Sequence, residues 1–382
     1  MRNKKTFAAL FAVLVSGTSV FCYLNFDMPV ASASYRFADF EGRPPIHVYK
    51  AGQSSASGVT PAEVKKAYGL PATGGSGTIA IIDAYDDPVI EADLAAFDKQ
   101  FGLPDCTTKN GCFEKHAMAS SIAKDGNWSM EISLDVEWAH AIAPKAKVLL
   151  VEAKTQSGAN LLSAVDYARG RKDVVAISMS WGGAEFSDEL SYDPHLMPDA
   201  NPDTVFFASS GDNGTGASWP AASPNVIGVG GTSLKLTSKG AFASETAWQG
   251  SGGGVSAYEK EPAFQSSYRI ARANGMRAIP DVSYDADPIS GYPVYYSGAK
   301  PSSAANWYVV GGTSAGAPQW AAIRALGSVT LSNIYADKAS AGTLKYFRDI
   351  TSGSNGDCKY FCDARKRYDY VTGLGSPQTA KF

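Results

Sequence analysis

The stretch Val310-Gly311-Gly312-Thr313-Ser314-Ala315-Gly316-Ala317-Pro318 surrounds one serine with glycines and other small residues. Glycine gives the backbone freedom and removes side-chain bulk, so the chain can close in around the Ser314 hydroxyl. A helix expected over 315–326 would bring its first N–H groups and the positive end of its dipole to that hydroxyl. A nucleophilic serine that forms an oxyanion intermediate needs such surroundings. A glycine-rich turn before a buried helix is the alternative, and this stretch alone leaves both open.

A nucleophilic serine needs a base, and the chain has four histidines: His47, His116, His140 and His195. None of them lies in a glycine-rich histidine motif. Glu131 and Asp135 indicate a different base, because carboxylates four residues apart in a helix lie on one face. If both point into a site, the pKa of one carboxyl rises, and the protonated group can relay a proton at acidic pH.

A solvated helix face is the ordinary explanation of a Glu-x-x-x-Asp pair. The flanking sequence argues against it here, because apolar residues crowd positions 132–143 and leave little polar face. We therefore expect a mostly buried helix over 130–143 that ends before Pro144.

Three motifs, in this order, resemble those of the sedolisins, the serine-carboxyl peptidases. They are the Glu131/Asp135 pair, Ser209-Ser210-Gly211-Asp212-Asn213-Gly214, and Gly312-Thr313-Ser314-Ala315-Gly316-Ala317-Pro318. The resemblance runs from about Val59 to the C-terminus, and further matching segments lie at 80–87, 177–183, 223–233, 251–256 and 372–377. Each segment is weak alone, but together and in order they are specific. The resemblance implies an α/β fold with a subtilisin-like parallel sheet and helices on both faces.

The resemblance also implies roles for single residues. Ser314 would be the nucleophile, Glu131 the general base, and Asp135 the carboxyl that orients Glu131 and holds the shared proton. Asp212 would donate a hydrogen bond to the oxyanion, which a carboxyl can do only when it is protonated. Without the resemblance, the sequence around Asp212 is typical of an ordinary turn.

Asp83 and Trp181 would extend the proton network, as comparable positions do in some members of the family. Asp83 follows an apolar run typical of a buried strand, and open α/β sheets place chemistry at the C-terminal ends of their strands. A helix cap or turn remains open for Asp83, and a plain core role for Trp181.

Two loops would form the walls of the cleft that hold the substrate backbone. Their residues are Ser180, Trp181, Gly182, Gly252, Gly253 and Gly254. A flexible glycine loop is the alternative for the second of them.

Residues near the C-terminus resemble the calcium site of the family. Asp349 and Asp369 would give carboxylate oxygens to one structural Ca²⁺, which prefers hard oxygen ligands. Backbone carbonyls would come from Ile350, Arg365 and Arg367. The family usually has glycine at the two arginine positions, and a glycine with positive φ does not tolerate a side chain. A solvated, charged loop is the alternative.

The N-terminus predicts export. Residues 1–33 combine early basic residues, an apolar run over 6–24 and the small-residue sequence Ala31-Ser32-Ala33, which is typical of a secretory signal peptide. An uncleaved membrane anchor is the alternative, and no second stretch could span a bilayer. Four of the five cysteines form two close pairs. Short-loop disulfides, Cys106–Cys112 and Cys358–Cys362, are the simplest of three connectivities.

Composition and pattern fit one large domain. The chain has 382 residues, of which 45% are hydrophobic and 19% charged, and its net charge of −3 gives no indication of nucleic-acid binding. Alternating strands and helices predict a parallel sheet in a single catalytic domain over 59–382, preceded by a short extended arm over 34–58. Strands are expected at 78–82, 147–152, 174–179, 204–208 and 226–229. Helices are expected at 61–68, 89–101, 130–143, 160–169 and 315–326.

The sequence therefore predicts a secreted, monomeric serine-carboxyl endopeptidase that cleaves protein or peptide substrates at acidic pH through an acyl-enzyme on Ser314. We expect no nucleic-acid partner and, after signal cleavage, no membrane attachment. One alternative is a subtilisin-type peptidase that uses Asp83, a histidine and Ser314. Another is a catalytically silent, secreted binding protein on the same fold, although all four expected catalytic residues are present.

Overall fold

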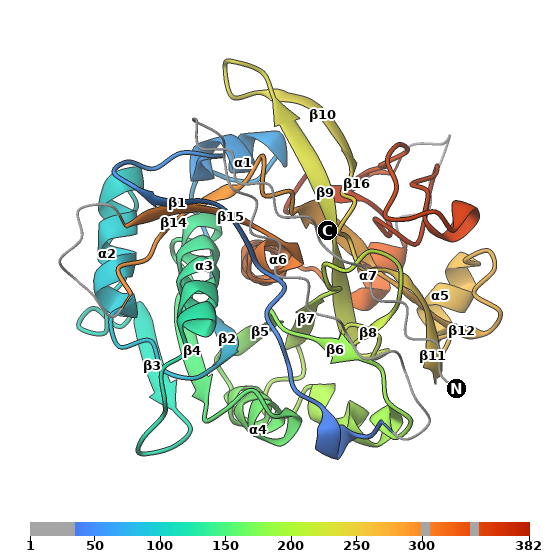
Figure 1. Ribbon diagram of the computed structural model, residues 1–382, viewed down its shortest axis with the longest axis horizontal. Coiled ribbons are helices and arrows are strands. Elements are labelled where there is room, and N and C mark those ends of the chain that lie inside the picture. The colour runs from blue at the N-terminus through green and yellow to red at the C-terminus, as the bar shows by residue number, and fades with distance from the viewer. Residues whose placement is uncertain (1–34, 299–305, 337–343) are drawn as a thin grey trace, which may run out of the picture.

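A mainly parallel β-sheet forms the centre of the computed structural model, which describes residues 35–298, 306–336 and 344–382 (Figure 1). The strand order is β10-β9-β7-β5-β2-β4-β3, and β13 also pairs with β9. All these pairs are parallel except β9 with β10. The strands are β2 (Thr78–Ala84), β3 (Phe113–Ala117), β4 (Lys147–Ala153), β5 (Val174–Met179), β7 (Val205–Ser209), β9 (Val226–Leu236), β10 (Phe242–Ala247) and β13 (Val282–Asp285).

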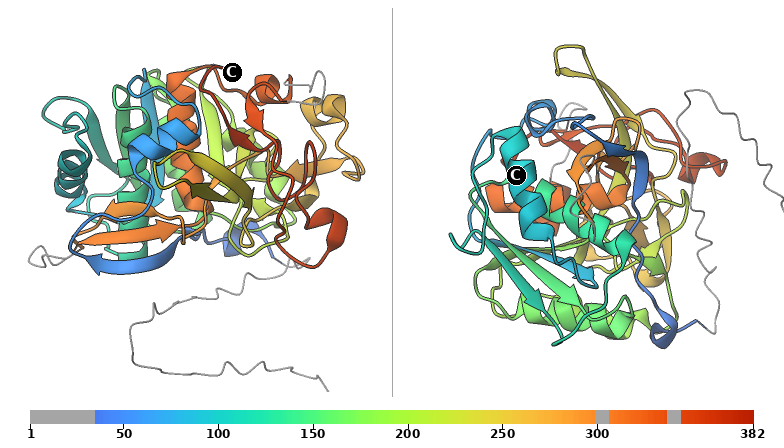
Figure 2. Two further views of the ribbon diagram at one scale, coloured as in Figure 1. Left: turned by 90° about the horizontal axis from the view of Figure 1, so that it is seen from above. Right: turned by 60° about the vertical axis from the view of Figure 1, so that its left-hand side comes forward.

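The sheet separates two hydrophobic cores. Side chains of a strand alternate between faces, so Ile79 and Ile81 of β2 join one core while Ala80 and Ile82 join the other. The first core contains side chains of α3 (Gly126–Ile142) and α6 (Gly316–Leu326), and the second contains side chains of α4 (Gly158–Arg169). The right-hand view of Figure 2 shows α4 on the opposite side of the sheet from the other two helices. Burial on both faces explains the continuous apolar strand sequences. The predicted parallel sheet with helices on both faces, in one domain, is confirmed.

The helix that carries the carboxylate pair is longer than predicted. Helix α3 begins at Gly126 because the Asp125 side chain accepts hydrogen bonds from the N–H groups of Asn127 and Trp128. Its buried character is confirmed, since every residue from 128 to 142 is buried. The other predicted helices, including α1 (Pro61–Ala67) and α2 (Ile90–Phe101), agree with the structure within two residues. The expected strand at 226–229 is wrong in length, because β9 continues to Leu236 to pair with β10.

Many smaller elements were not predicted. A three-stranded antiparallel sheet has the order β1-β15-β14, and its middle strand leads to Ser314. The unpredicted elements are η1 (Phe37–Asp39), β1 (His47–Gln53), β6 (Gly183–Ala184), η2 (Glu189–Leu196), β8 (Ser218–Trp219), β11 (Gly254–Lys260), α5 (Ala263–Tyr268), β12 (Met276–Ile279), β14 (Tyr292–Tyr295), β15 (Trp307–Gly311), η3 (Thr313–Ala315), α7 (Leu331–Ala336), β16 (Phe347–Arg348), η4 (Lys359–Phe361) and β17 (Ser376–Pro377), together with β3, β10 and β13.

The N-terminal arm is packed against the domain. Phe40 is buried, and its ring meets the rings of Phe186 and Trp219. Further along the arm, β1 pairs antiparallel with β15, so that His47 lies opposite Gly311. The arm is therefore extended over β1, but the aromatic side chains before it enter the second core. The predicted signal peptide over 1–33 lies outside the described residues.

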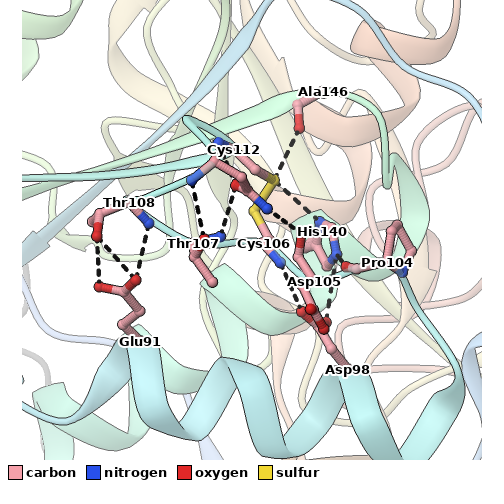
Figure 3. Close-up of a disulfide and its surroundings, with 11 residues drawn as sticks. Glu91, Asp98, Pro104, Asp105, Cys106, Thr107, Thr108, Cys112, His140 and Ala146 are labelled. Atoms are coloured by element: carbon pink, nitrogen blue, oxygen red, sulfur yellow. Dashed lines mark hydrogen bonds and ion pairs between the residues drawn. A yellow bond between two sulfur atoms is a disulfide. The ribbon is translucent and has the colours of Figure 1, made fainter.

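Both predicted disulfides are present in the structure. The Cys106–Cys112 bond closes the loop between α2 and β3, and its Cys112 sulfur lies 4.0 Å from His140 Nδ1 (Figure 3). The other ring nitrogen of His140 lies 2.9 Å from the carbonyl oxygen of Pro104. This histidine thus serves the packing of the loop onto α3. Among the helices of the described ranges, none is both long and apolar enough to cross a bilayer.

Candidate active site

Five residues that the sequence analysis singled out converge at the C-terminal edge of the sheet. Glu131 and Asp135 project from α3, and Asp83 lies near the end of β2. Asp212 follows β7, and Ser314 lies on the short helix η3 between β15 and α6. Their charges and hydroxyl groups act on one another: Asp83 raises the pKa of both carboxyls on α3, and Ser314 lowers that of Glu131. These segments are far apart in sequence, so only the fold assembles them.

Ser314 lies in a turn that requires glycine. Gly312 has φ 122°, a conformation that side chains disfavour. A Cβ atom there would also collide with the carbonyl oxygen of Pro45 and with Asp212. The buried Ser314 hydroxyl lies 3.5 Å from the carbonyl oxygen of Ser180, at the outer limit of hydrogen bonding. The hydroxyl is therefore only weakly engaged.

Glu131 and Asp135 are fully buried one helical turn apart. Burial raises the pKa of both carboxyls well above the usual range, and the charge of Asp83 raises it further. Ser314 is close enough to lower the pKa of Glu131, yet no well-aligned donor among the described residues reaches the carboxyl oxygens of this pair. Buried carboxyls without cations are stable only if they hold protons. The pair therefore shares at least one proton.

Asp83 connects the pair to an acidic group that the sequence analysis missed. Asp83 lies opposite Glu152 in the parallel register of β2 and β4, which puts both side chains on one face of the sheet. Burial, and then the charge of Glu152, raise the pKa of Asp83. Glu152 contacts the partly exposed Lys115 ammonium at 2.9 Å. An acidic residue ending an apolar stretch was the available signal for Glu152.

Trp181 has a structural role in the same region. Its indole N–H donates to the carbonyl oxygen of Ile82 at 2.8 Å, and its side chain is buried in the second core. Trp181 thereby fixes the loop after β5 to the strand that carries Asp83. Its direct part in a proton network stays a prediction.

The Asp212 carboxylate has three polar contacts, two with Thr313 and one with His47. Its Oδ1 accepts the Thr313 N–H at 2.8 Å and the Thr313 hydroxyl at 2.7 Å. Its Oδ2 lies 2.9 Å from Nε2 of His47 in the N-terminal arm. Burial would lower the pKa of His47, but the contact with Asp212 raises it above the ordinary value. Neither partner of Asp212 was predicted, and nothing in the sequence of the arm indicates that His47 reaches this loop.

The glycines of the second predicted wall are held by close backbone contacts. The Gly252 N–H donates to the carbonyl oxygen of Gly211 at 2.7 Å, and the Ser210 hydroxyl donates to the Gly252 carbonyl oxygen at 2.8 Å. A Cβ at Gly253 would collide with the carbonyl oxygen of Tyr370. This loop is buried and ordered by hydrogen bonds, which contradicts a flexible glycine loop. Its contact with substrate stays a prediction.

The residues of the predicted calcium site lie together on two neighbouring loops. Both carboxylate oxygens of Asp349 accept the Arg367 N–H, at 3.0 and 2.9 Å. Asp369 accepts the Arg365 N–H at 2.9 Å. Arg367 has φ 67°, a conformation in which glycine is favoured, so the turn is kept although its residue differs. Within the described residues, no hydrogen bond reaches the carbonyl oxygens of Ile350, Arg365 and Arg367. The oxygens of Asp369 also accept hydrogen bonds from Val371 and Thr372, so the three carbonyls are the unengaged oxygens of this set. Carboxylate and carbonyl oxygens are the ligands that a hard cation prefers.

Comparisons with known proteins agree with this arrangement. A family model described as the subtilase family matches residues 92–339, which include Glu131, Asp135, Asp212 and Ser314. Sedolisin of Pseudomonas sp. (strain 101) is 28% identical over 372 residues, covering 86% of this chain and 61% of sedolisin. Kumamolisin of Bacillus sp. (strain MN-32) is 29% identical over 407 aligned residues, covering 91% of this chain and 67% of kumamolisin. This chain therefore spans less than two thirds of the length of the sedolisin relative.

A solved structure extends the likeness to three dimensions. The structure of Pseudomonas sedolisin, described as a serine-carboxyl proteinase complexed with two molecules of pseudo-iodotyrostatin, has a TM-score of 0.69 and 28% identity. The match covers 85% of this chain and 96% of that chain. The motif order, the assembled site and these likenesses lead to one conclusion: the chain belongs to the subtilase family and, within it, to the sedolisins.

Proposed function

We propose that this protein is a secreted serine-carboxyl endopeptidase that hydrolyses peptide bonds at acidic pH through an acyl-enzyme on Ser314. The observation that carries the proposal is the buried Ser314 hydroxyl beside Glu131, whose own partner is Asp135. A serine with a carboxyl base, oriented by a third group, has the organisation that nucleophilic catalysis needs. Membership of the family and the likeness to a solved serine-carboxyl proteinase support the same chemistry.

In the proposed reaction, the Ser314 oxygen attacks the carbonyl carbon of the scissile bond while Glu131 takes the serine proton. Asp135 shares a proton with Glu131 and keeps it oriented. Glu131 then returns the proton to the leaving amine as the C–N bond breaks, which leaves an acyl ester on Ser314. Water, activated by Glu131 in the same way, releases the acid product and restores the serine.

Asp212 would act on the oxyanion of the tetrahedral intermediate. A carboxyl can donate a hydrogen bond to that oxygen only when it is protonated. The Thr313 hydrogen bonds to Oδ1 hold the group beside the nucleophile turn. The proton would lie on Oδ2, in place of the contact that this oxygen makes with His47. The proposed role therefore needs the protonated form of this residue.

A histidine-based serine peptidase is the second candidate, because His47 lies 2.9 Å from Asp212. The other histidines are engaged elsewhere: His116 stacks on Tyr167, and His195 pairs with Asp166. His140 packs against the disulfide. If the second candidate is correct, replacing His47 abolishes activity at every pH.

A protein-digest assay from about pH 3 to pH 8 tests the proposal. Wild type should be most active in the acidic half of this range, because its carboxyls must hold protons. Ser314→Ala should abolish hydrolysis and keep the fold, as judged by circular dichroism, because the covalent step is lost. An optimum near pH 8 would contradict the carboxyl mechanism, and activity of Ser314→Ala within tenfold of wild type would contradict the nucleophile.

We further propose one structural Ca²⁺ held by Asp349, Asp369 and the carbonyls of Ile350, Arg365 and Arg367. When bound, the ion would tie the two loops together by neutralising two carboxylates. Export is supported by the signal-like N-terminal sequence and by the two disulfides, which are typical of oxidising compartments. The substrates would be proteins or peptides.

A further inference from the structure

A buried histidine lies against the Cys106–Cys112 disulfide, outside the proposed active site (Figure 3). One ring nitrogen of His140, near the end of α3, lies within 4.8 Å of both sulfurs. His140 and Cys106 are buried, and Cys112 is partly exposed. Two cysteine sulfurs and one imidazole nitrogen are ligands that Zn²⁺ prefers in proteins. The cluster therefore has the composition of a zinc site, although its sulfurs are bonded to each other.

The surroundings of His140 decide which ring nitrogen carries the proton. Nε2 lies 2.9 Å from the carbonyl oxygen of Pro104 and 3.4 Å from Oδ1 of Asp98. A carbonyl oxygen accepts a hydrogen bond and cannot donate one, so Nε2 holds the proton. Burial also lowers the pKa of His140, which favours the neutral ring near pH 7. Nδ1 is then left with a lone pair beside Cys112 Sγ, 4.0 Å away.

This lone pair has no donor in the oxidised protein. Cys112 Sγ is the contact of Nδ1 within the described residues, and a disulfide sulfur carries no proton that it could donate. Buried polar atoms in native proteins nearly always have a partner, and an atom without one calls for an explanation. A metal ion held between Nδ1 and the sulfurs would use the lone pair.

Asp98 orients the ring from the other side, as Figure 3 shows. Its Oδ2 accepts the Cys106 N–H at 3.2 Å. Its Oδ1 is buried and accepts no well-aligned hydrogen bond from the described part of the chain. Histidines that bind zinc usually donate their other ring N–H to a carboxylate or to a backbone carbonyl, which fixes the ring. His140 has both kinds of acceptor at Nε2, so the ring is already oriented for a metal at Nδ1.

We propose that the reduced loop binds one Zn²⁺ through Cys106 Sγ, Cys112 Sγ and His140 Nδ1, with a water molecule in the fourth position. Three protein ligands and a water give zinc its tetrahedral coordination. The water reaches the ion from the partly exposed side of Cys112. The oxidised loop does not bind the ion, because the ligand form of cysteine is the thiolate. The inference is independent of the proposed peptidase function, since the cluster shares no residue with the active site.

The change from disulfide to zinc site is a two-electron reduction. A dithiol reductant attacks Sγ of Cys112, the more exposed sulfur, and Cys106 leaves as a thiolate that takes up a proton. The second thiol of the reductant then attacks the mixed disulfide and releases Cys112, so the reductant becomes a disulfide and the two cysteines become thiols. Binding of Zn²⁺ releases the two thiol protons to solvent. The zinc would then join the loop between α2 and β3 to α3.

Cobalt binding tests the inference without using activity. The probe is the full chain with Ser314→Ala, which prevents self-digestion, and with Cys358→Ser and Cys362→Ser, which remove the second disulfide. After reduction by a phosphine without oxygen, Co²⁺ should give the near-ultraviolet charge-transfer band of thiolate ligands, and Zn²⁺ should remove it because zinc binds such sites more tightly. The oxidised protein should give no band. A reduced, folded protein without the band would overturn the inference.

Two histidine variants decide whether His140 is a ligand. His140→Ala should weaken Co²⁺ binding at least about tenfold, and Asp98→Ala should weaken it about tenfold, because the ring loses an acceptor at Nε2. His116→Ala is the matched control and should leave the affinity unchanged, since His116 stacks on Tyr167. Equal affinities of the parent protein and His140→Ala would contradict the proposed ligand set.

Thermal unfolding covers the case in which the reduced chain is unstable. With Ca²⁺ in every sample to fill the proposed calcium site, Zn²⁺ should raise the melting temperature of the reduced protein and not that of the oxidised protein. An equal rise in both forms would show that Zn²⁺ binds elsewhere, and would overturn the inference. If the reduced chain is unfolded without metal, Zn²⁺ should restore the circular dichroism of the oxidised protein, and failure to restore it counts against the site in the same way.

Discussion

At the scale of single residues, burial decides the chemistry of the site. Asp83, Glu131 and Asp135 are fully buried, and none of them contacts a cation among the described residues. Desolvation disfavours the charged form, so the pKa of each carboxyl rises well above its usual range. A carboxyl that keeps its proton in the interior can serve as both acid and relay, so the proposed mechanism needs no histidine.

The first prediction compares two glutamates of one helix. Glu131→Gln should lower kcat about 1,000-fold, because the amide cannot accept the Ser314 proton. Glu137→Gln is the matched control: Glu137 is also fully buried on α3, but its Oε2 accepts the Tyr295 N–H away from Ser314. Initial rates at the pH optimum provide the measurement. If Glu131→Gln keeps more than a tenth of the wild-type rate, Glu131 is not the base.

At the scale of elements, turns decide where the functional groups lie. The nucleophile turn depends on Gly312, whose positive φ directs the chain from β15 into η3. The same position lets the arm and Asp212 approach the backbone. The geometry of the site is therefore set by the absence of a side chain as much as by the presence of others.

The second prediction compares Gly312 with Gly102. Both have a positive φ that strains a residue with a side chain, but only Gly312 has atoms close to the position of an added Cβ. Gly312→Ala should cost at least about 1 kcal/mol of stability and lower kcat/KM more than tenfold, because its Cβ collides with Pro45 and Asp212. Gly102→Ala, at the end of α2, has φ 65° and no atom within 4 Å of the added Cβ. It should lose stability by a similar strain and keep kcat/KM. Denaturant unfolding measures the stability of both variants, and steady-state kinetics measures their kcat/KM. If Gly312→Ala keeps the kcat/KM of the wild type, the added Cβ does not disturb the site.

At the scale of the whole molecule, many buried carboxyls suit the protein to acid. Burial raises the pKa of Asp98 to about 7, that of Glu152 to about 7 and that of Glu259 to about 8. These groups keep their protons in the folded protein at pH values where the unfolded chain has lost them. The folded state therefore binds more protons, and the free energy of unfolding falls as pH rises from about 4 through these values.

The third prediction follows from that sign. The melting temperature should be at least about 5 °C higher at pH 5 than at pH 8, measured by calorimetry at constant ionic strength. Asp98→Asn should flatten the dependence, because the amide mimics the neutral acid at every pH. A melting temperature that rises between pH 5 and pH 8 would show that these carboxyls are ionised in the folded protein.

The fourth prediction concerns calcium. A metal that binds only the folded state raises stability by mass action, so EDTA should lower the melting temperature of the wild type. Asp369→Asn should remove this sensitivity, whatever its own effect on stability. Asp363→Asn is the control: Asp363 pairs with Arg365 in the same loop but is not among the proposed ligands, so the effect of EDTA should remain. A wild-type melt that EDTA does not change would favour the alternative of a plain charged loop.

Features that depend on contacts between distant parts of the chain could not be predicted from the sequence. Helix α3 was predictable because its apolar residues and its carboxylate pair are local, and only its start was wrong, since the Asp125 cap was not recognised. Strand β1 has no such signal: it is half exposed, and its partner β15 lies more than 250 positions further along the chain. The same holds for Glu152, whose importance depends on its register with Asp83 across two strands.

The sequence by itself determined the family motifs and the alternation of strands and helices, and it predicted the five residues of the proposed site, because these depend on residue type and local spacing. The tertiary structure alone decided which groups meet. It placed His47 on Asp212, Glu152 beside Asp83 and the arm against Gly312. The physical reason is that a charge or a hydrogen bond acts over a few ångströms in space, and chain position does not fix distance between segments that only folding brings together.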